Sequence, residues 1–387
     1  MKKNNTYIIN TLFFICSPLI ATIYALIKRN GNDKYFILFL FTAWFSFVIN
    51  PQGEEQDLYR YMDSLFNLRA NSVSEIFQMY ITGQLEDSFI PFIQLLVSQF
   101  TTNGHILLLV CGIILGLFYT LSIKLFPNDK SLYTISLVFI FSFIVGLDRL
   151  GGIRNIIGFY LFFWSISSFF RTNNYWYILG GIFACTIHFS YIIYLLIFFL
   201  SKIIGNKKCI FYVAIASFFL SFFITKLNVG NFSAFLGEAI SFKASEYTHG
   251  TIAENLTKGL QNVNWYVRYE IPMLRHGFMV LIIFIYRLIK RGKQDSNVGL
   301  LSFIFLMIIF SNLMLSIPNL NGWIIMVTYS FVIYYLSTII HSLNNIMKKR
   351  LILVALFFSV LHIAYTVRQI TYICYLSDLI LPIFVEL

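Results

Sequence analysis

The chain has 387 residues, of which 58% are hydrophobic, 19% aromatic and only 12% charged. Soluble domains carry about 25% charged residues, so this composition excludes a soluble enzyme, a disordered protein and a disulfide-stapled secreted domain. On a soluble surface the net charge of +11 would suggest a nucleic-acid partner. In a chain this apolar we expect no nucleic-acid partner. The useful question is how the charged residues are distributed between the two sides of a lipid bilayer.

Long apolar runs follow one another along almost the whole chain. Helices of about 20 apolar residues cross a bilayer and satisfy their own backbone groups in lipid. The runs therefore predict one all-α polytopic membrane domain over residues 1–387, with about 11–12 transmembrane helices plus short interfacial or re-entrant helices. They lie at 7–27, 35–50, 104–126, 132–147, 153–170, 175–200, 209–225, 276–290, 298–316, 323–342 and 351–373.

Lys and Arg in short connections predict the orientation, because they favour the cytoplasmic side. The basic clusters share that side only if the N-terminus is outside and run 175–200 enters the membrane and returns. The polar break His188-Phe189-Ser190 predicts two short helices that meet near His188. The resulting charge is +13 on the cytoplasmic side and −2 outside. The clusters are Lys28/Arg29/Lys34, Lys124/Lys130, Arg171, Lys202/Lys207/Lys208, Arg287/Lys290/Arg291/Lys293 and Lys348/Lys349/Arg350.

Two outside segments are large enough to carry function. Segment 51–103 is acidic and contains a short amphipathic stretch, Phe89–Phe100, which is too short to cross and is expected at the interface. Segment 226–275 is too long for a plain connector and is rich in aromatic residues. It is predicted to fold as an extracytoplasmic cap.

A first candidate group follows the second apolar run, in Asp57-Leu58-Tyr59-Arg60-Tyr61. On a helix, Asp57, Arg60 and Tyr61 share a face because they lie at positions i, i+3 and i+4. The group could bind substrate or act as an acid–base site. A local Asp–Arg pair that merely solvates a loop is the alternative.

A second group lies where one span ends and the next begins. Arg149 and Arg154 flank Gly151-Gly152, and glycines let the backbone approach a ligand closely. A guanidinium matches the geometry of phosphate oxygens. An interfacial arginine that reaches out to the surface is the alternative.

Other polar residues give weaker indications. His188 is an ionisable group in the middle of a long apolar run, which makes it a functional candidate. Arg275 and Arg368 lie near the outer ends of spans and could join an anionic site. We find no phosphate loop, no paired-cysteine motif and no His-x-x-x-His pattern, so no metal and no cofactor is expected.

These residues resemble the EpsG-like group of Wzy-type polysaccharide polymerases. Asp57-x-x-Arg60-Tyr61 resembles its Asp/Tyr-rich motif, and Glu86 followed by an amphipathic stretch is similar to the segment that comes next. Ile153-Arg154 is similar to the family's Ile-Arg-Gln segment, with Asn155 where glutamine is usual. Ile187-His188-Phe189-Ser190 is similar to its Ile-His-x-Ser segment. The resemblance covers residues 35–205.

The resemblance implies a multi-pass glycosyltransferase of the bacterial inner membrane whose active site faces the periplasm or exterior. Its donor and acceptor would be oligosaccharide repeat units on undecaprenyl diphosphate, joined into O-antigen, capsule or exopolysaccharide. A chain-length regulator is a candidate partner. The catalytic candidates are Asp57, His188 and Arg154, with either Asp57 or His188 as the base. The substrate-binding candidates are Arg60, Tyr61, Glu86, Arg149, Arg275 and Arg368.

Three other functions fit parts of the pattern. A lipid-linked oligosaccharide flippase or transporter would need polar residues along a path to both faces and often has internal repeats, of which we find none. A sugar O-acyltransferase would use a membrane histidine but take its donor from the cytoplasmic side. An O-antigen ligase shares the lipid donor and differs only in its acceptor.

Overall fold

The computed structural model describes residues 2–28, 33–50, 57–69, 71–82, 85, 87–129, 131–204, 207–223, 264–290, 298–315 and 318–380. Throughout these ranges the regular structure is helical, without a strand, which confirms the all-α class. Five helical stretches are long and apolar enough to cross a membrane, and six shorter apolar helices accompany them. The chain is therefore a polytopic membrane protein, as predicted.

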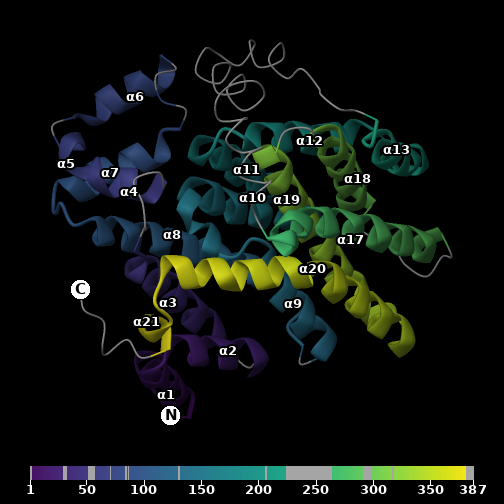
Figure 1. Ribbon diagram of the computed structural model, residues 1–387, viewed down its shortest axis with the longest axis horizontal. Coiled ribbons are helices and arrows are strands. Elements are labelled where there is room, and N and C mark those ends of the chain that lie inside the picture. Colours follow the sequence, from purple (N-terminus) through teal and green to yellow (C-terminus); the bar gives the residue numbers. More distant parts are fainter. Residues whose placement is uncertain are drawn as a thin grey trace.

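A helical bundle and a small lateral lobe make up the molecule (Figure 1). The bundle contains α1 (Lys2–Cys16), α2 (Pro18–Lys28), α3 (Asp33–Val48), α8 (Gly104–Ile123), α9 (Leu132–Ile144), α10 (Ile153–Thr172), α11 (Trp176–Ile187), α12 (Tyr191–Ile203), α13 (Lys207–Leu220), α17 (Trp265–Lys290), α18 (Val298–Leu313), α19 (Pro318–Ile339) and α20 (Asn345–Ile373). The lobe contains α4 (Asp57–Asp63), α5 (Leu65–Leu68), α6 (Val73–Ile81) and α7 (Phe89–Ser98). Short elements are η1 (Leu147–Gly152), η3 (Ile340–Ser342) and α21 (Leu376–Ile380).

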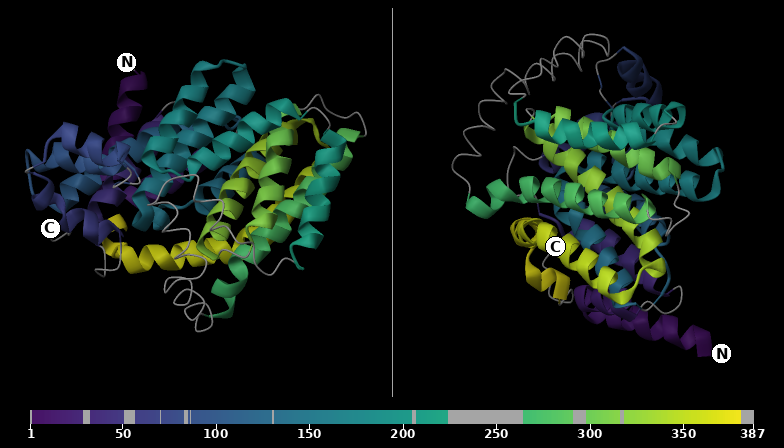
Figure 2. Two further views of the ribbon diagram at one scale, coloured as in Figure 1. Left: turned by 90° about the horizontal axis from the view of Figure 1, so that it is seen from above. Right: turned by 90° about the vertical axis from the view of Figure 1, so that its right-hand side faces the viewer.

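Close packing holds the bundle, because lipid supplies no hydrophobic force between helices. Helices α3 and α8 approach closely where α8 has glycines: a Cβ at Gly112 would meet Ser46 Cβ at 2.5 Å, and one at Gly116 would meet the Phe39 carbonyl oxygen at 3.0 Å. Helices α10 and α19 form the centre, where the rings of Phe163 and Phe331 lie 4.9 Å apart. Figure 2 shows the bundle helices side by side in two further views.

Run 175–200 enters the bundle and returns, as predicted. Helix α11 ends at Ile187, His188 takes an extended conformation and α12 starts at Tyr191. Tyr191 bonds to the carbonyl of Asn155 near the start of α10, whereas Phe198 meets Phe169 near the end of α10. Helix α12 therefore runs parallel to α10, while Tyr175 just before α11 also meets Phe169. The two short helices form a hairpin with His188 at its tip.

Basic connections gather at one end of the bundle, which we call the basic end. Lys34 bonds to Asn128, and His341 Nε2 lies 2.9 Å from Asp129. Helix α10 runs parallel to α19, because Phe159 meets Trp323 and Phe163 meets Tyr334 further along both helices. Arg171 and Lys202 therefore lie at the same end as His341. This arrangement agrees with the predicted sharing of one side by the basic clusters.

Two predicted boundaries are wrong. Run 7–27 is not one span: α1 ends at Cys16 and α2 begins at Pro18, because proline cannot donate the hydrogen bond that would continue a helix. The ring of Phe13 meets Tyr24 at 6.0 Å, so the two helices fold back on each other. At the other boundary, α17 begins at Trp265 and continues through Pro272, so the last residues of segment 226–275 are helical. Residues 226–263 lie outside the described ranges.

Candidate functional site

Arg154 stands in the first turn of α10, at the end of the bundle opposite the basic end. Its Nη1 donates to Asp87 Oδ2 at 2.6 Å, and its Nη2 lies 3.9 Å from Asp57 Oδ2. The Arg154 side chain is 19% exposed, whereas that of Asp87 is fully buried. A charge-assisted bond of this length fixes the guanidinium firmly.

Asp87 also holds the tip of the α11–α12 hairpin. The backbone N–H of Phe189 donates to Asp87 Oδ1 at 2.8 Å. One carboxylate therefore joins the lobe, the start of α10 and the hairpin tip. Burial of a carboxylate is tolerated here because both oxygens accept hydrogen bonds.

Helix α4 presents Asp57, Arg60 and Tyr61 toward Arg154. Arg60 donates to Asp57 one turn earlier, and the Arg154 guanidinium lies 5.7 Å from the centre of the Tyr61 ring. Burial raises the pKa of the Tyr61 phenol well above its ordinary value, although the Arg154 charge opposes the shift. Tyr61 therefore stays a neutral phenol, which suits it to hydrogen bonding and not to proton abstraction.

Helix α7 is joined to α4 by hydrogen bonds from Gln94. Gln94 is buried, and its Nε2 donates to the Tyr61 carbonyl and to Ser64 Oγ, both at 2.8 Å. This bond ties the short α4, which could not be stable alone, to the lobe. The amphipathic stretch predicted at the interface is thus the platform on which α4 rests.

His188 lies at the hairpin tip, where its Nδ1 contacts Ser190. Its Nδ1 accepts from the Ser190 backbone N–H at 3.2 Å and lies 2.9 Å from Ser190 Oγ. A neutral imidazole carries one proton, so Nδ1 as an acceptor places that proton on Nε2. His188 is therefore arranged as a hydrogen-bond donor through Nε2, an arrangement that favours Asp57 over His188 as the base. We call the group Asp57, Arg60, Tyr61, Asp87, Arg154 and His188 the Asp57–Arg154 site.

A second polar cluster joins η1 to α17 and α20. Arg149 Nε lies 3.3 Å from Asp148 Oδ2, and Arg149 Nη2 lies 4.0 Å from Glu270 Oε1. Glu270 Oε2 in turn lies 3.1 Å from His362 Nδ1. The Arg149 guanidinium stacks over Tyr365 at 5.4 Å. We call these five residues the His362 network.

Glu270 and His362 share one proton. His362 is fully buried, and its Nε2 lies 2.9 Å from the carbonyl of Ile144, so Nε2 must carry a hydrogen. The contact between Nδ1 and the Glu270 carboxyl then needs a single proton between them. Whether that proton sits on the ring or on the carboxyl, the pair is neutral overall, which makes its burial tolerable.

The other predicted cations lie apart from the Asp57–Arg154 site. Arg275 bonds to Asn312 Oδ1 on α18. Arg368 Nη2 donates to the Tyr372 hydroxyl at 2.9 Å, and its guanidinium lies 5.7 Å from the Tyr266 ring. The structure thus brings together five of the predicted residues, namely Asp57, Arg60, Tyr61, Arg154 and His188. The other three, Arg149, Arg275 and Arg368, each lie in different surroundings.

Asp87, Glu270 and His362 are among the cluster residues that sequence reasoning did not select. Asp87 was passed over for its neighbour Glu86, which lies outside the described residues. The place of Asp87 in the sequence could have indicated it, because Asp87 directly precedes Ser88 and the apolar helix α7. Glu270 and His362 are 92 residues apart, and no local pattern links them.

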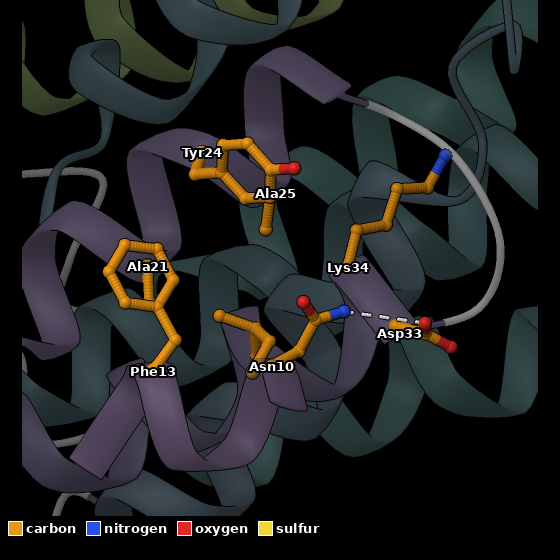
Figure 3. A pocket seen from close by; sticks show the side chains of 8 residues that line it. Asn10, Phe13, Ala21, Tyr24, Ala25, Asp33 and Lys34 are labelled. Atoms are coloured by element: carbon orange, nitrogen blue, oxygen red, sulfur yellow. Dashed lines mark hydrogen bonds between the residues drawn. The ribbon is translucent and has the colours of Figure 1, made fainter. Parts of the chain in front are cut away.

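Neither a metal-ligand group nor the cavity described next lies at the Asp57–Arg154 site within the described residues. In the described ranges, no group of three His, Cys, Asp or Glu side chains is placed to hold a metal. A cavity of about 20 Å³ lies near the basic end between α1, α2 and α3, where Asn10 donates to Asp33 (Figure 3). This volume holds about one water molecule, so the cavity is a packing feature.

The comparisons with known proteins agree with the sequence resemblance. The model of the EpsG family matches residues 52–383 of the chain. This match covers the lobe, the Asp57–Arg154 site and the His362 network. No curated protein and no solved structure matches the chain.

Proposed function

Because this chain belongs to the EpsG family, a family associated with polysaccharide biosynthesis, we propose that it is a membrane glycosyltransferase. It polymerises oligosaccharide repeat units carried on undecaprenyl diphosphate, on the outer face of the bacterial inner membrane. One observation carries the proposal: Arg154, the partly exposed Asp57 and the His188 tip meet at one place. That place lies opposite the basic end, which is cytoplasmic by the positive-inside rule.

The reaction needs no nucleotide, because the sugar is already activated by its diphosphate. An acceptor hydroxyl oxygen attacks the anomeric carbon of the donor chain, and the bond from that carbon to the diphosphate oxygen breaks. The diphosphate leaves with the bonding electron pair, and the hydroxyl proton passes to a base. Catalysis thus requires stabilisation of charge on the leaving group and one proton acceptor.

Arg154 and His188 stabilise the leaving diphosphate in this proposal. The guanidinium donates to its oxygens, and the Nε2–H of His188 supplies a second donor. Asp87 does not touch substrate; it positions both groups, since it bonds to Arg154 and to the backbone N–H of Phe189. Fixed donors are effective because they need not reorganise during the reaction.

Asp57 is the proposed base. Its side chain is 33% exposed, so an acceptor hydroxyl can reach it, unlike the buried Asp87. Arg60 and Tyr61 flank Asp57 and are placed to orient sugar hydroxyls. The outer segment 226–275 is proposed to cover the sugars, and a chain-length regulator to bind on the outer side.

A test uses a strain lacking the gene and complemented with variants. Arg154→Ala is expected to abolish the long-chain polysaccharide ladder, because the loss of one fixed donor costs about 10²–10³ in rate. Arg171→Ala, at the basic end of the same helix, is the matched control and should restore the ladder. Near-normal amounts of long-chain polysaccharide from a normally expressed Arg154→Ala protein would contradict the proposal.

The deletion strain itself separates the rival functions. A polymerase defect leaves single repeat units displayed on the surface. Loss of every unit, including the single ones, indicates a flippase or a ligase. Loss of acetyl or other acyl groups from polymer of normal length indicates an acyltransferase.

A further inference from the structure

Arg275 is a buried arginine whose hydrogen-bond partners among the described residues are all neutral. It lies on α17 and is 4% exposed. Its Nε donates to Asn312 Oδ1 at 2.9 Å, and its Nη2 donates to the Phe218 carbonyl and to Ser221 Oγ. The Asn312 amide is itself fixed, because its Nδ2 donates to Ser217 Oγ at 3.0 Å.

Its charge is compensated only in part. Arg154 and Arg149 each have carboxylates beside them, but Arg275 has none among the described residues. The end of α13, whose carbonyl at Phe218 it caps, offers about half an elementary negative charge. Its Nη1 makes no hydrogen bond within the described ranges. A guanidinium has five N–H donors, so two remain for a ligand.

A buried guanidinium without a carboxylate partner destabilises the folded protein unless an anion binds to it. Arginine within membrane segments pairs with an acid or lines a wet path, and an unpaired buried charge is strongly unfavourable. If the residue only linked α13 to α18 by hydrogen bonds, it would need no charge. A glutamine could make such bonds equally well. The retained charge therefore points to an anionic ligand.

The surroundings of Arg275 suggest a lipid as that ligand. Its guanidinium lies 4.5 Å from the Phe218 ring and 5.3 Å from the Phe222 ring. Apolar side chains at this end of α13 are strongly exposed, with Phe219 60%, Phe222 58% and Phe223 81% accessible. An apolar face beside a cation matches a molecule with a phosphate head and a hydrocarbon tail.

His276 adds a second polar group at the same place. Its ring meets the Phe218 ring edge-on at 5.5 Å. Its Nδ1 lies 2.6 Å from the Pro272 carbonyl, so Nδ1 carries the hydrogen and Nε2 stays available for a ligand hydroxyl or, when protonated, for an anion.

We propose that Arg275, with Asn312, Ser221 and His276 around it, forms a binding site for a lipid phosphate group on the membrane-facing side of α13 and α17. This site is separate from the Asp57–Arg154 site and stands whether or not the chain polymerises sugars. The phosphate belongs either to a polyprenyl diphosphate carrier or to an anionic phospholipid.

The test measures lipid binding to the full-length protein by native mass spectrometry. The probes are a polyprenyl diphosphate, phosphatidylglycerol and a polyprenol without phosphate. Arg275→Gln is expected to weaken binding of the phosphorylated probe by about tenfold or more, the effect of one charge-assisted contact. Arg275→Lys should lose less, and Arg171→Gln should change nothing.

The probes separate the two sources of phosphate. Loss confined to the polyprenyl diphosphate identifies the carrier, and loss for phosphatidylglycerol as well identifies a general lipid-phosphate site. Unchanged binding of both probes to a folded Arg275→Gln protein overturns the proposal. Because this assay involves no sugar, its failure leaves the proposed polymerisation untouched.

A second measurement keeps the proposal testable if Arg275→Gln does not fold. Wild-type protein is crosslinked to a polyprenyl diphosphate that carries a photoreactive group beside the diphosphate. Crosslinks are expected in residues 218–223 and 268–277. Crosslinks restricted to α4 and the start of α10 would overturn the site.

Discussion

Two polar clusters of similar composition lie on either side of η1, which packs against both α4 and α20. The Asp57–Arg154 site and the His362 network each contain two carboxylates, a tyrosine and a histidine, with two arginines in the first and one in the second. In the first, Asp57 and Arg154 reach the surface; in the second, Asp148, Glu270 and His362 are sealed. The arginines do not separate the two clusters, because Arg149 is 27% exposed and Arg154 19%. The difference lies in Asp57, which is 33% exposed, whereas both carboxylates of the His362 network are buried. We therefore expect chemistry at the first cluster and a structural role for the second.

Among the substitutions that test this comparison, Asp57→Asn should lower the rate of polymer formation most. Removal of a general base lowers rates by about 10²–10⁴, and a side chain that is one-third exposed can lose its charge without unfolding the protein. The rate of polymer formation by purified protein measures the effect. Asp63→Asn, at the end of the same helix, is the control. A wild-type rate for Asp57→Asn would remove Asp57 from the mechanism.

Asp87→Asn should reduce activity by about 10- to 100-fold, the value of one charge-assisted hydrogen bond. Asparagine still accepts from the Phe189 N–H but no longer balances Arg154. Since Asp87 positions and does not react, Asp87→Glu should recover part of the rate. Equal loss in Asp87→Glu and Asp57→Asn would instead mean that Asp87 touches the substrate.

Glu270→Gln should act on stability and spare the chemistry. Leaving one partner of a buried hydrogen-bonded pair unsatisfied costs about 1–3 kcal/mol, so the thermal unfolding temperature should fall. Activity per folded molecule should stay within about threefold of wild type. A Glu270→Gln/His362→Gln double variant should be no less stable than the sum of the single changes predicts. A stable but inactive Glu270→Gln protein would place the network in the reaction.

Arg60→Ala should have the smallest effect. Its side chain is 65% exposed, and exposed ion pairs contribute little, so a loss of less than about fivefold is expected in the polymer-formation assay. A larger loss, with KM raised and kcat unchanged, would show that the contacts of Arg60 with sugar hydroxyls contribute much of the substrate binding.

Much of the architecture could be predicted from apolar runs and the placement of Lys and Arg. The hairpin at His188 followed from requiring all basic clusters to share one side, and the contacts of Phe198 with Phe169 bear it out. The break at Pro18 was missed because run 7–27 is apolar on both sides of it. Proline at the first position of a helix is an ordinary signal, and here it outweighs hydropathy.

The candidate site was harder to predict than the fold. Motif order located Asp57, Arg154 and His188, which local spacing can reveal. Arg149 and Arg275 were grouped with Arg154 by charge and side of the membrane alone. Their actual partners, Glu270 for one and Asn312 for the other, come from distant helices. Such pairings depend on where α17 lies relative to η1 and α18, which no local pattern encodes.

The shortness of the α11–α12 hairpin has a consequence for the lipid around it. Helix α11 has 12 residues and is about 18 Å long, well below the hydrocarbon thickness of about 30 Å. Tyr175 and Trp176, 75% and 76% exposed, anchor its basic end at the interface. The deficit in length therefore falls at the His188 end, where we expect hydrophobic mismatch to thin the bilayer. Such thinning would bring the head groups of nearby lipids toward the depth of Arg154.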